Sequence, residues 1–222
     1  MLKPKIVFSV FILFLLAGCN VLGQKDISEM DPAELPDVIA FQDDFTREFM
    51  SSLEEVEDGY YLFESKTGGY TMMYPENATM NQTYYQKNKD TFETIQFGHS
   101  NENAEIPFYV RATYDKNKDT KNTDIYLDLL SSSISYEGEF EQLEYTDKDI
   151  YFGTMKHVTE LEDLSEKSST YRFFGFIQSK NNDQAVRYTL NVLCDDEEIG
   201  CDYDLDSIEN GVKKVMESIE FN

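Results

Sequence analysis

Two cysteines near the C-terminus are close enough in the sequence to form a disulfide. Cys194 and Cys201 enclose six residues, and thiols so close together in an exported protein are usually oxidised. The bridge would join the end of a predicted strand to the loop before the last predicted helix, and the entropic model gives so small a ring about 2 to 3 kcal/mol. No C-x-x-C spacing and no nearby histidine accompany the pair. A structural disulfide is therefore favoured over free thiols, a redox centre or a metal site.

Acidic side chains are concentrated around these cysteines. Within twelve residues there are seven carboxylates, namely Asp195, Asp196, Glu197, Glu198, Asp202, Asp204 and Asp206. Ca²⁺ takes six to eight oxygen ligands, and Asp202, Asp204 and Asp206 have the spacing that begins an EF-hand loop. Ser207 stands where that loop requires glycine, and Lys213 stands where it requires a bidentate glutamate. A solvated acidic loop, with Asp206 capping the next helix, is the favoured interpretation, and a cation site at the three aspartates is the alternative.

No familiar catalytic arrangement is found in the sequence. His99 and His157 are the only histidines, and neither has a metal-ligating partner at short spacing. The sequence contains no G-x-S-x-G, P-loop, dinucleotide fingerprint or H-E-x-x-H motif. We therefore predict a protein that is not an enzyme and needs no cofactor, with an unrecognised hydrolase as the remaining enzymatic alternative.

Tyrosines are the residues most suited to recognition. The chain has 15 Tyr and 16 Phe, and a tyrosine brings an apolar ring and a polar tip at little entropic cost. Most of them fall in predicted strands, where packing explains them. Tyr84 and Tyr85 instead fall in a predicted connection, and we expect a binding surface there.

The charge of the chain excludes one class of partner. The formal net charge is −24, and a protein this acidic repels phosphate backbones, so nucleic-acid binding is excluded. Hydrophobic residues make up 41% of the chain, which is too many for a disordered acidic tail. We expect residues 36–222 to fold as a single domain.

The N-terminus has the features of an export signal. Lys3 and Lys5 precede an apolar run over residues 6–16, which is too short to span a bilayer as a helix. The tetrapeptide Leu16-Ala17-Gly18-Cys19 resembles the lipobox of bacterial lipoproteins. That resemblance implies that residues 1–18 are a signal peptide and that Cys19 carries fatty acyl chains such as palmitate. An ordinary secretory signal with an incidental cysteine is the alternative. Two or three acyl chains would hold the mature protein on a membrane surface.

The rest of the chain divides into elements by its hydrophobic periodicity. Residues 19–35 have no sustained period and are expected to form a tether. Residues 36–56 place apolar side chains at three- and four-residue spacing, which predicts an amphipathic helix packed on the domain, with docking to a partner or membrane surface as the alternative. Further helices are predicted from Asn122 or Thr123 and from Asp206. Strand patterns occur at residues 60–65, 70–74, 91–98, 108–114, 139–146, 150–159, 170–178 and 185–194.

This order of elements predicts an α+β domain. An antiparallel sheet of about six to eight strands with helices on its faces would bury the apolar stripes. The segments Gly69-Tyr70-Thr71-Met72-Met73-Tyr74-Pro75 and Val215-Met216-Glu217-Ser218-Ile219-Glu220-Phe221 are similar to the opening strand and closing helix of the PsbP-like α/β sandwich. The predicted helix at residues 36–56 lies outside that pattern. The resemblance implies a binding or accessory role, because members of that family mostly bind or assist other proteins.

Three functions remain open at this point. The first is a non-enzymatic lipoprotein, anchored to the membrane outside the cytoplasm, whose acidic domain binds an envelope protein or a cell-wall component. The second is a lipoprotein that binds Ca²⁺ in the acidic loop at residues 195–206. The third is an envelope hydrolase.

Overall fold

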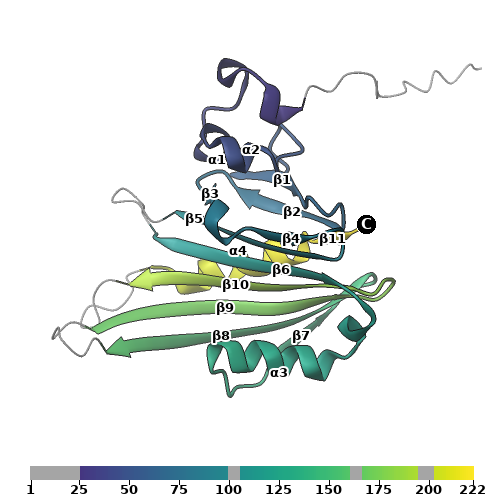
Figure 1. The fold of residues 1–222 in the computed structure, drawn as a ribbon. Coiled ribbons are helices and arrows are strands. Elements are labelled where there is room, and N and C mark those ends of the chain that lie inside the picture. The colour runs from purple at the N-terminus through teal and green to yellow at the C-terminus, as the bar shows by residue number, and fades with distance from the viewer. Residues whose placement is uncertain (1–25, 100–105, 161–166, 195–202) are drawn as a thin grey trace, which may run out of the picture.

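The computed structural model describes residues 26–99, 106–160, 167–194 and 203–222. Within these residues the strands form one large and one small antiparallel sheet (Figure 1). The large sheet has the strand order β3 (Thr79–Met80), β5 (Phe92–His99), β6 (Phe108–Lys116), β10 (Gln184–Cys194), β9 (Lys167–Ser179), β8 (Lys148–Glu160) and β7 (Glu141–Glu144), with β4 (Gln86–Asn88) also paired to β5. The small sheet has the order β1 (Tyr60–Glu64), β2 (Tyr70–Pro75) and β11 (Glu220–Phe221). The predicted antiparallel α+β fold is confirmed.

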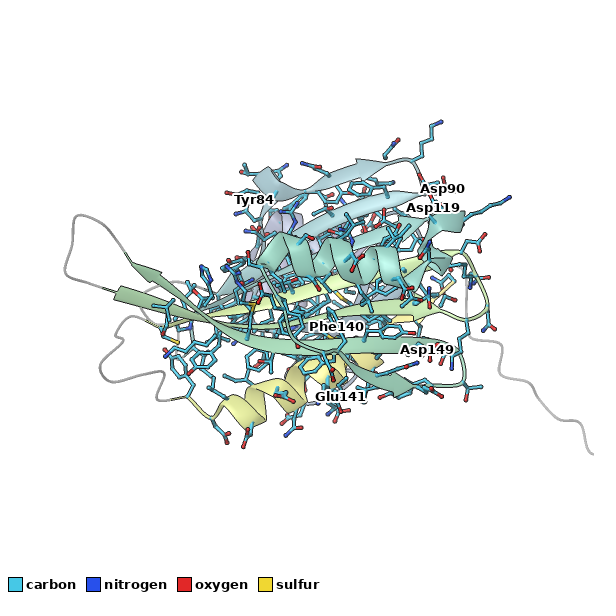
Figure 2. The ribbon with its side chains drawn as sticks, turned by 90° about the horizontal axis from the view of Figure 1, so that it is seen from below. Tyr84, Asp90, Asp119, Phe140, Glu141 and Asp149 are labelled. Carbon is cyan, nitrogen blue, oxygen red and sulfur yellow. The ribbon has the colours of Figure 1, made fainter. Side chains whose placement is uncertain are left out.

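Two helices cover opposite faces of the large sheet (Figure 2). On β9 the neighbouring side chains Phe173 and Phe174 point to opposite faces, as alternation requires. Phe174 packs in the apolar cluster of α3 (Thr123–Ile134), whereas Phe173 belongs to the main core together with Met216 of α4 (Leu205–Glu217). Helix α4 also contacts β2, so it is packed between the two sheets. The main core therefore lies between the sheets, and α3 covers only part of the outer face.

The prediction of a single helix over residues 36–56 is wrong. The structure has two short helices, α1 (Ile39–Gln42) and α2 (Asp44–Arg47). Asp43 separates them because its backbone is extended and its side chain accepts hydrogen bonds from the backbone N–H (2.7 Å) and hydroxyl of Thr46. After α2, Met50 forms a β-bridge to Phe63. Phe41, Phe49 and Met50 of this segment are buried, whereas Val56 at its end is 46% exposed. Strand β1 rather than a helix organises its second half.

The predicted tether is also shorter than expected. Residues 19–25 lie outside the described residues, but residues 26–35 form two 3₁₀ turns, η1 (Ile27–Glu29) and η2 (Pro32–Glu34). Ile27 is 7% exposed and belongs to the main core. The folded domain therefore begins about ten residues before the predicted boundary at residue 36.

The helix caps were predicted in part. Asn122 caps α3, as expected, by accepting a hydrogen bond from the backbone N–H of Ile125. Helix α4 is capped by Asp204, whose carboxylate accepts from the backbone N–H of Ser207 at 3.0 Å. The prediction of Asp206 as the cap is therefore wrong by two residues, because the helix begins earlier than its apolar stripe.

A buried carboxylate connects the two sheets. Glu93 of β5 is fully buried and accepts hydrogen bonds from the hydroxyl of Ser65, the backbone N–H of Lys66 (3.1 Å) and the hydroxyl of Tyr85 (3.1 Å). Burial raises the pKa of this carboxyl, and the hydrogen bonds only partly offset that effect. The charged form of Glu93 is therefore disfavoured in the folded protein relative to the unfolded chain.

We expect this pKa shift to appear in the pH dependence of stability. Because the folded pKa lies above the unfolded value of about 4.3, the contribution of Glu93 to stability is largest at low pH and is lost as pH rises through the folded pKa. Glu93→Gln keeps an acceptor oxygen and removes the charge. Urea denaturation between pH 4.5 and 7.5 should show wild type losing stability relative to Glu93→Gln as the pH rises. A difference that stays constant or changes in the opposite direction contradicts the prediction.

Candidate functional site

A groove of about 680 Å³ crosses the outer face of the large sheet beside α3. Its floor is formed by alternate side chains of β5, β6 and β10. The intervening side chains, such as Val110 and Tyr188, are buried in the core on the other face. Leu130 and Ser133 of α3 form part of the wall. The groove exists because α3 covers β9 and the neighbouring part of β10 but leaves β5 and β6 uncovered.

Arginines gather in this groove. The chain has four arginines, and Arg111, Arg172 and Arg187 all line it. None of the described lining residues is acidic, although the chain contains 43 Asp and Glu residues. The groove is therefore a local positive site on a strongly negative protein.

Strand pairing fixes the arrangement of these arginines. In the register of the large sheet, Arg187 on β10 lies opposite Thr113 on β6, and Arg111 on β6 lies opposite Thr189 on β10. The two arginines are thus diagonal neighbours, at a typical separation of about 7 to 8 Å. Arg172 on β9 lies opposite Asn191 on β10. All three side chains start from regular strands, so the backbone holds their positions firmly.

Two of the guanidinium groups are anchored by hydrogen bonds. Arg187 forms an ion pair with Asp115 at 3.2 Å and lies over the ring of Tyr126, 5.8 Å from its centroid. Burial raises the pKa of Asp115, while Arg187 acts in the opposite direction. Arg172 donates from Nε to Oδ1 of Asn191 (3.0 Å) and from Nη1 to the carbonyl of Ile134 (3.4 Å), at the end of α3. These contacts hold both side chains in place before any ligand arrives.

Arg111 is different, because it is exposed and forms no ion pair with the described residues. Arg172 likewise has no acidic partner among them. A guanidinium group presents its donors in a planar fork that matches a carboxylate or a phosphate. The groove can therefore bind an anionic group through Arg111, supported by Arg172.

The rim of the groove contains one of the two predicted binding tyrosines. Tyr84, labelled in Figure 2, ends the turn η3 (Gln82–Tyr84), lines the groove and is 52% exposed. Tyr85 lies elsewhere, because its ring packs against Phe45 and Phe49 at 5.6 and 5.4 Å and its hydroxyl bonds to Glu93. The prediction placed two adjacent residues on one surface, whereas the end of the turn directs them to different sides.

Helix α3 exposes an apolar stripe next to the groove. Ile125 and Leu129 are 49% and 50% exposed. Ile125, Leu129 and Ser133 are spaced four residues apart, so all three lie on one face of the helix. Ser133 lines the groove. The buried residues of this helix are Tyr126, Leu130 and Ile134, so Ile125 and Leu129 lie outside its buried face. Large exposed apolar side chains next to a polar groove are typical of binding surfaces.

A second cavity lies on the inner face of the same strands. It has a volume of about 470 Å³ and is mainly apolar, with Val110, Leu190 and Val212 among its lining residues. His99 also lines it, and its Nε2 is buried without a hydrogen-bond partner among the described residues. His157 lies apart from it on β8 and is partly exposed.

The other predicted sites lie at the limits of the described residues. Cys19, Cys201 and Asp202 fall outside them. Cys194 is 4% exposed and disulfide-bonded, while its pairing with Cys201 stays a prediction. No cluster of three or more His, Cys, Asp or Glu side chains suited to a metal occurs within the described segments. Asp206 is exposed, and the predicted cation site remains untested.

The Cys194–Cys201 pairing can be tested by thiol labelling. We expect the mature protein to show no reactive thiol when denatured without reductant, and two after reduction. Reduction should lower the melting temperature by several degrees, because loss of a small ring costs about 2 kcal/mol. Two reactive thiols without reductant contradict the pairing.

The chain is thus an acidic α+β domain with an arginine-lined groove on one face of its large sheet. The chain belongs to the family described as "Putative lipoprotein YvcA", whose model matches residues 36–220. It is 32% identical over 237 residues to the Bacillus subtilis (strain 168) protein of that name, covering 98% of this chain and 96% of the relative. The lipoprotein part of the predicted resemblance is thus supported by the family.

Two solved structures are similar in part. The Ran-binding protein Mog1p of Saccharomyces cerevisiae matches 72% of this chain and 94% of its own, with 13% identity and a TM-score of 0.45. A mutant of protein Mog1 matches 72% of this chain and 95% of its own, with 11% identity and a TM-score of 0.46. Within the described part of the chain, no helix has the length and apolarity needed to cross a bilayer.

Proposed function

We propose that this chain is a lipid-anchored extracytoplasmic protein that binds another component of the cell envelope and catalyses no reaction. The Leu16-Ala17-Gly18-Cys19 tetrapeptide and the name of the family support the anchor. The observation that carries the binding role is the groove, where Arg111, Arg172 and Arg187 meet on a face free of acidic lining residues.

The chemistry of the groove suits recognition. Arginine and tyrosine are enriched at the energetic centres of protein interfaces, and Arg111 and Tyr84 are both exposed there. Hydrogen bonds to charged groups contribute about 1.5 to 3 kcal/mol each, so gaining or losing one anionic contact changes the affinity by about tenfold or more. The negative field of the rest of the domain would turn away polyanions and favour partners with a limited number of negative charges.

The anchor is tested by changing Cys19 to alanine. We expect the variant to accumulate as an unprocessed precursor or to be released into the medium, because acylation and cleavage at a lipobox both require its cysteine. Membrane fractionation and incorporation of labelled palmitate measure the effect. Cys201→Ala is the matched control and should keep the anchor. Unchanged size and membrane retention of the Cys19→Ala variant contradict the proposal.

The binding role is tested by cross-linking in cells. A photoreactive amino acid replaces Tyr84 in the full chain. In a control variant of the same chain it replaces Val56, which is 46% exposed and does not line the groove. We expect a discrete adduct at position 84 that disappears when Arg111→Gln is added, and no such adduct at position 56. Absence of an adduct at position 84, or an adduct indifferent to Arg111, contradicts binding through the groove.

A further inference from the structure

We infer that the groove binds a peptide segment of a partner protein that carries one or two carboxylates next to apolar side chains. This inference rests on the proposed function and specifies its ligand. It combines three features of one surface. They are Arg111, which has no ion pair with any described residue, the exposed apolar stripe of Ile125 and Leu129, and the polar floor of the groove.

The limited positive charge of the groove sets the number of anionic groups. Arg187 is already paired with Asp115, so Arg111 and Arg172 are the two guanidinium groups in the groove without an acidic partner among the described residues. Figure 2 shows Tyr84 toward one end of this face and Asp90 and Asp119 toward the other, and both aspartates are exposed. A long polyanion would extend from the groove toward these carboxylates and be repelled, whereas a ligand with one or two charges would not.

The apolar stripe indicates that the ligand has apolar side chains as well. Ile125 and Leu129 are half exposed on the face of α3 that leads to Ser133 in the groove wall. Burying such side chains contributes about 25 cal/mol for each Å² removed from water. A phosphate or sugar-phosphate polymer has little apolar surface with which to cover them. A peptide offers a carboxylate and an apolar side chain a few residues apart.

The floor of the groove also matches a peptide backbone. Gln96, Thr189 and Asn191 line it, and their side chains provide both donors and acceptors. An extended peptide presents alternating N–H and C=O groups, and both kinds can be satisfied there. A phosphate polymer presents acceptors almost alone, so it would leave the acceptors of the floor unsatisfied.

The inference is tested with an array of random decapeptides probed with the mature, lipidated protein in detergent. Wild type is compared with two groove variants, Arg111→Gln and Leu129→Ser, and with one control variant. Lys118→Gln is the matched control, because Lys118 is exposed, does not line the groove, and its substitution removes the same single charge. We expect wild type to select peptides in which one or two acidic residues stand within four positions of Leu, Ile, Val or Phe.

Affinities of the selected peptides are then measured by fluorescence anisotropy. Arg111→Gln should weaken binding by about tenfold or more, as expected for a lost charged hydrogen bond. Leu129→Ser should weaken it by at least about threefold, and Lys118→Gln should leave it unchanged. Inorganic phosphate should compete no better than acetate at equal ionic strength.

Several results overturn the inference. In the array, these are the selection of no peptide and the selection of peptides that have no acidic residue or long acidic runs. In the affinity measurements, they are equal binding by Arg111→Gln and wild type, and stronger competition by phosphate than by acetate. A cross-link at position 84 that depends on Arg111 would still support the proposed function in each of these cases. A wrong assignment of the ligand as a peptide is therefore distinguishable from a wrong assignment of the groove as the binding site.

Discussion

Replacing Phe63 by alanine is expected to lower the free energy of unfolding by about 3 to 5 kcal/mol. Phe63 of β1 is fully buried at the centre of an aromatic cluster. Its ring stacks on Phe49 with centroids 5.6 Å apart and on Tyr74 of β2 at 6.4 Å. The residue thus joins the N-terminal segment to the small sheet, and its loss leaves a cavity that these rings cannot close.

Urea denaturation measures this effect, and the melting temperature should fall by about 10 °C for a domain of this size. Leu62→Ala is the matched control, because Leu62 precedes Phe63 on the same strand and is only partly buried. Leu62→Ala should lower the free energy of unfolding clearly less than Phe63→Ala does. Equal costs for the two variants would mean that the aromatic cluster has no special role in stability.

Arg111→Glu is expected to weaken partner binding by about a hundredfold. The change removes the donors of the guanidinium group and introduces a carboxylate that repels an anionic ligand, which together correspond to about 2.7 kcal/mol. Stability should change by less than about 0.5 kcal/mol, because Arg111 is exposed and has no ion pair with the described residues. Binding and stability are therefore expected to separate in this variant.

The measurement is the affinity for the best peptide from the array, together with the yield of the cross-link at position 84. Lys118→Glu changes the net charge by the same amount outside the groove and serves as the control. A similar loss in both variants would show that overall charge, and not the groove, determines binding. A loss that comes with unfolding of Arg111→Glu would contradict the assignment of Arg111 as a surface contact.

Most strands of the large sheet were predictable from the sequence. On β10, Val186, Tyr188 and Val192 alternate with Arg187, Thr189 and Asn191, and the structure buries the first set in the main core. A period of two residues is sufficient to indicate a strand with one buried face. The stripe of α4 was predictable in the same way, because Val212, Val215 and Met216 recur at helical spacing and are all buried.

The segment at residues 36–56 was not predictable by that method. Its apolar residues recur at helical spacing, yet only α1 and α2 are helical. Phe49 and Met50 flank the edge of β1, where the backbone of Phe49 accepts a hydrogen bond from Glu64 at 2.9 Å. A partner strand formed later in the chain decided the conformation, and periodicity within the segment cannot report such a partner.

The sequence by itself determined the charge of this protein, its expected export signal, its longer strands and its two long helices, because each of these depends on neighbouring residues. It also indicated that Arg187 lies on a polar strand face. Only the tertiary structure joined Arg187 to Arg111 and Arg172, which lie on β6 and β9 at either side of β10. The order of strands in a sheet depends on contacts between distant segments, and the groove is a consequence of that order and of the place where α3 stops covering the sheet.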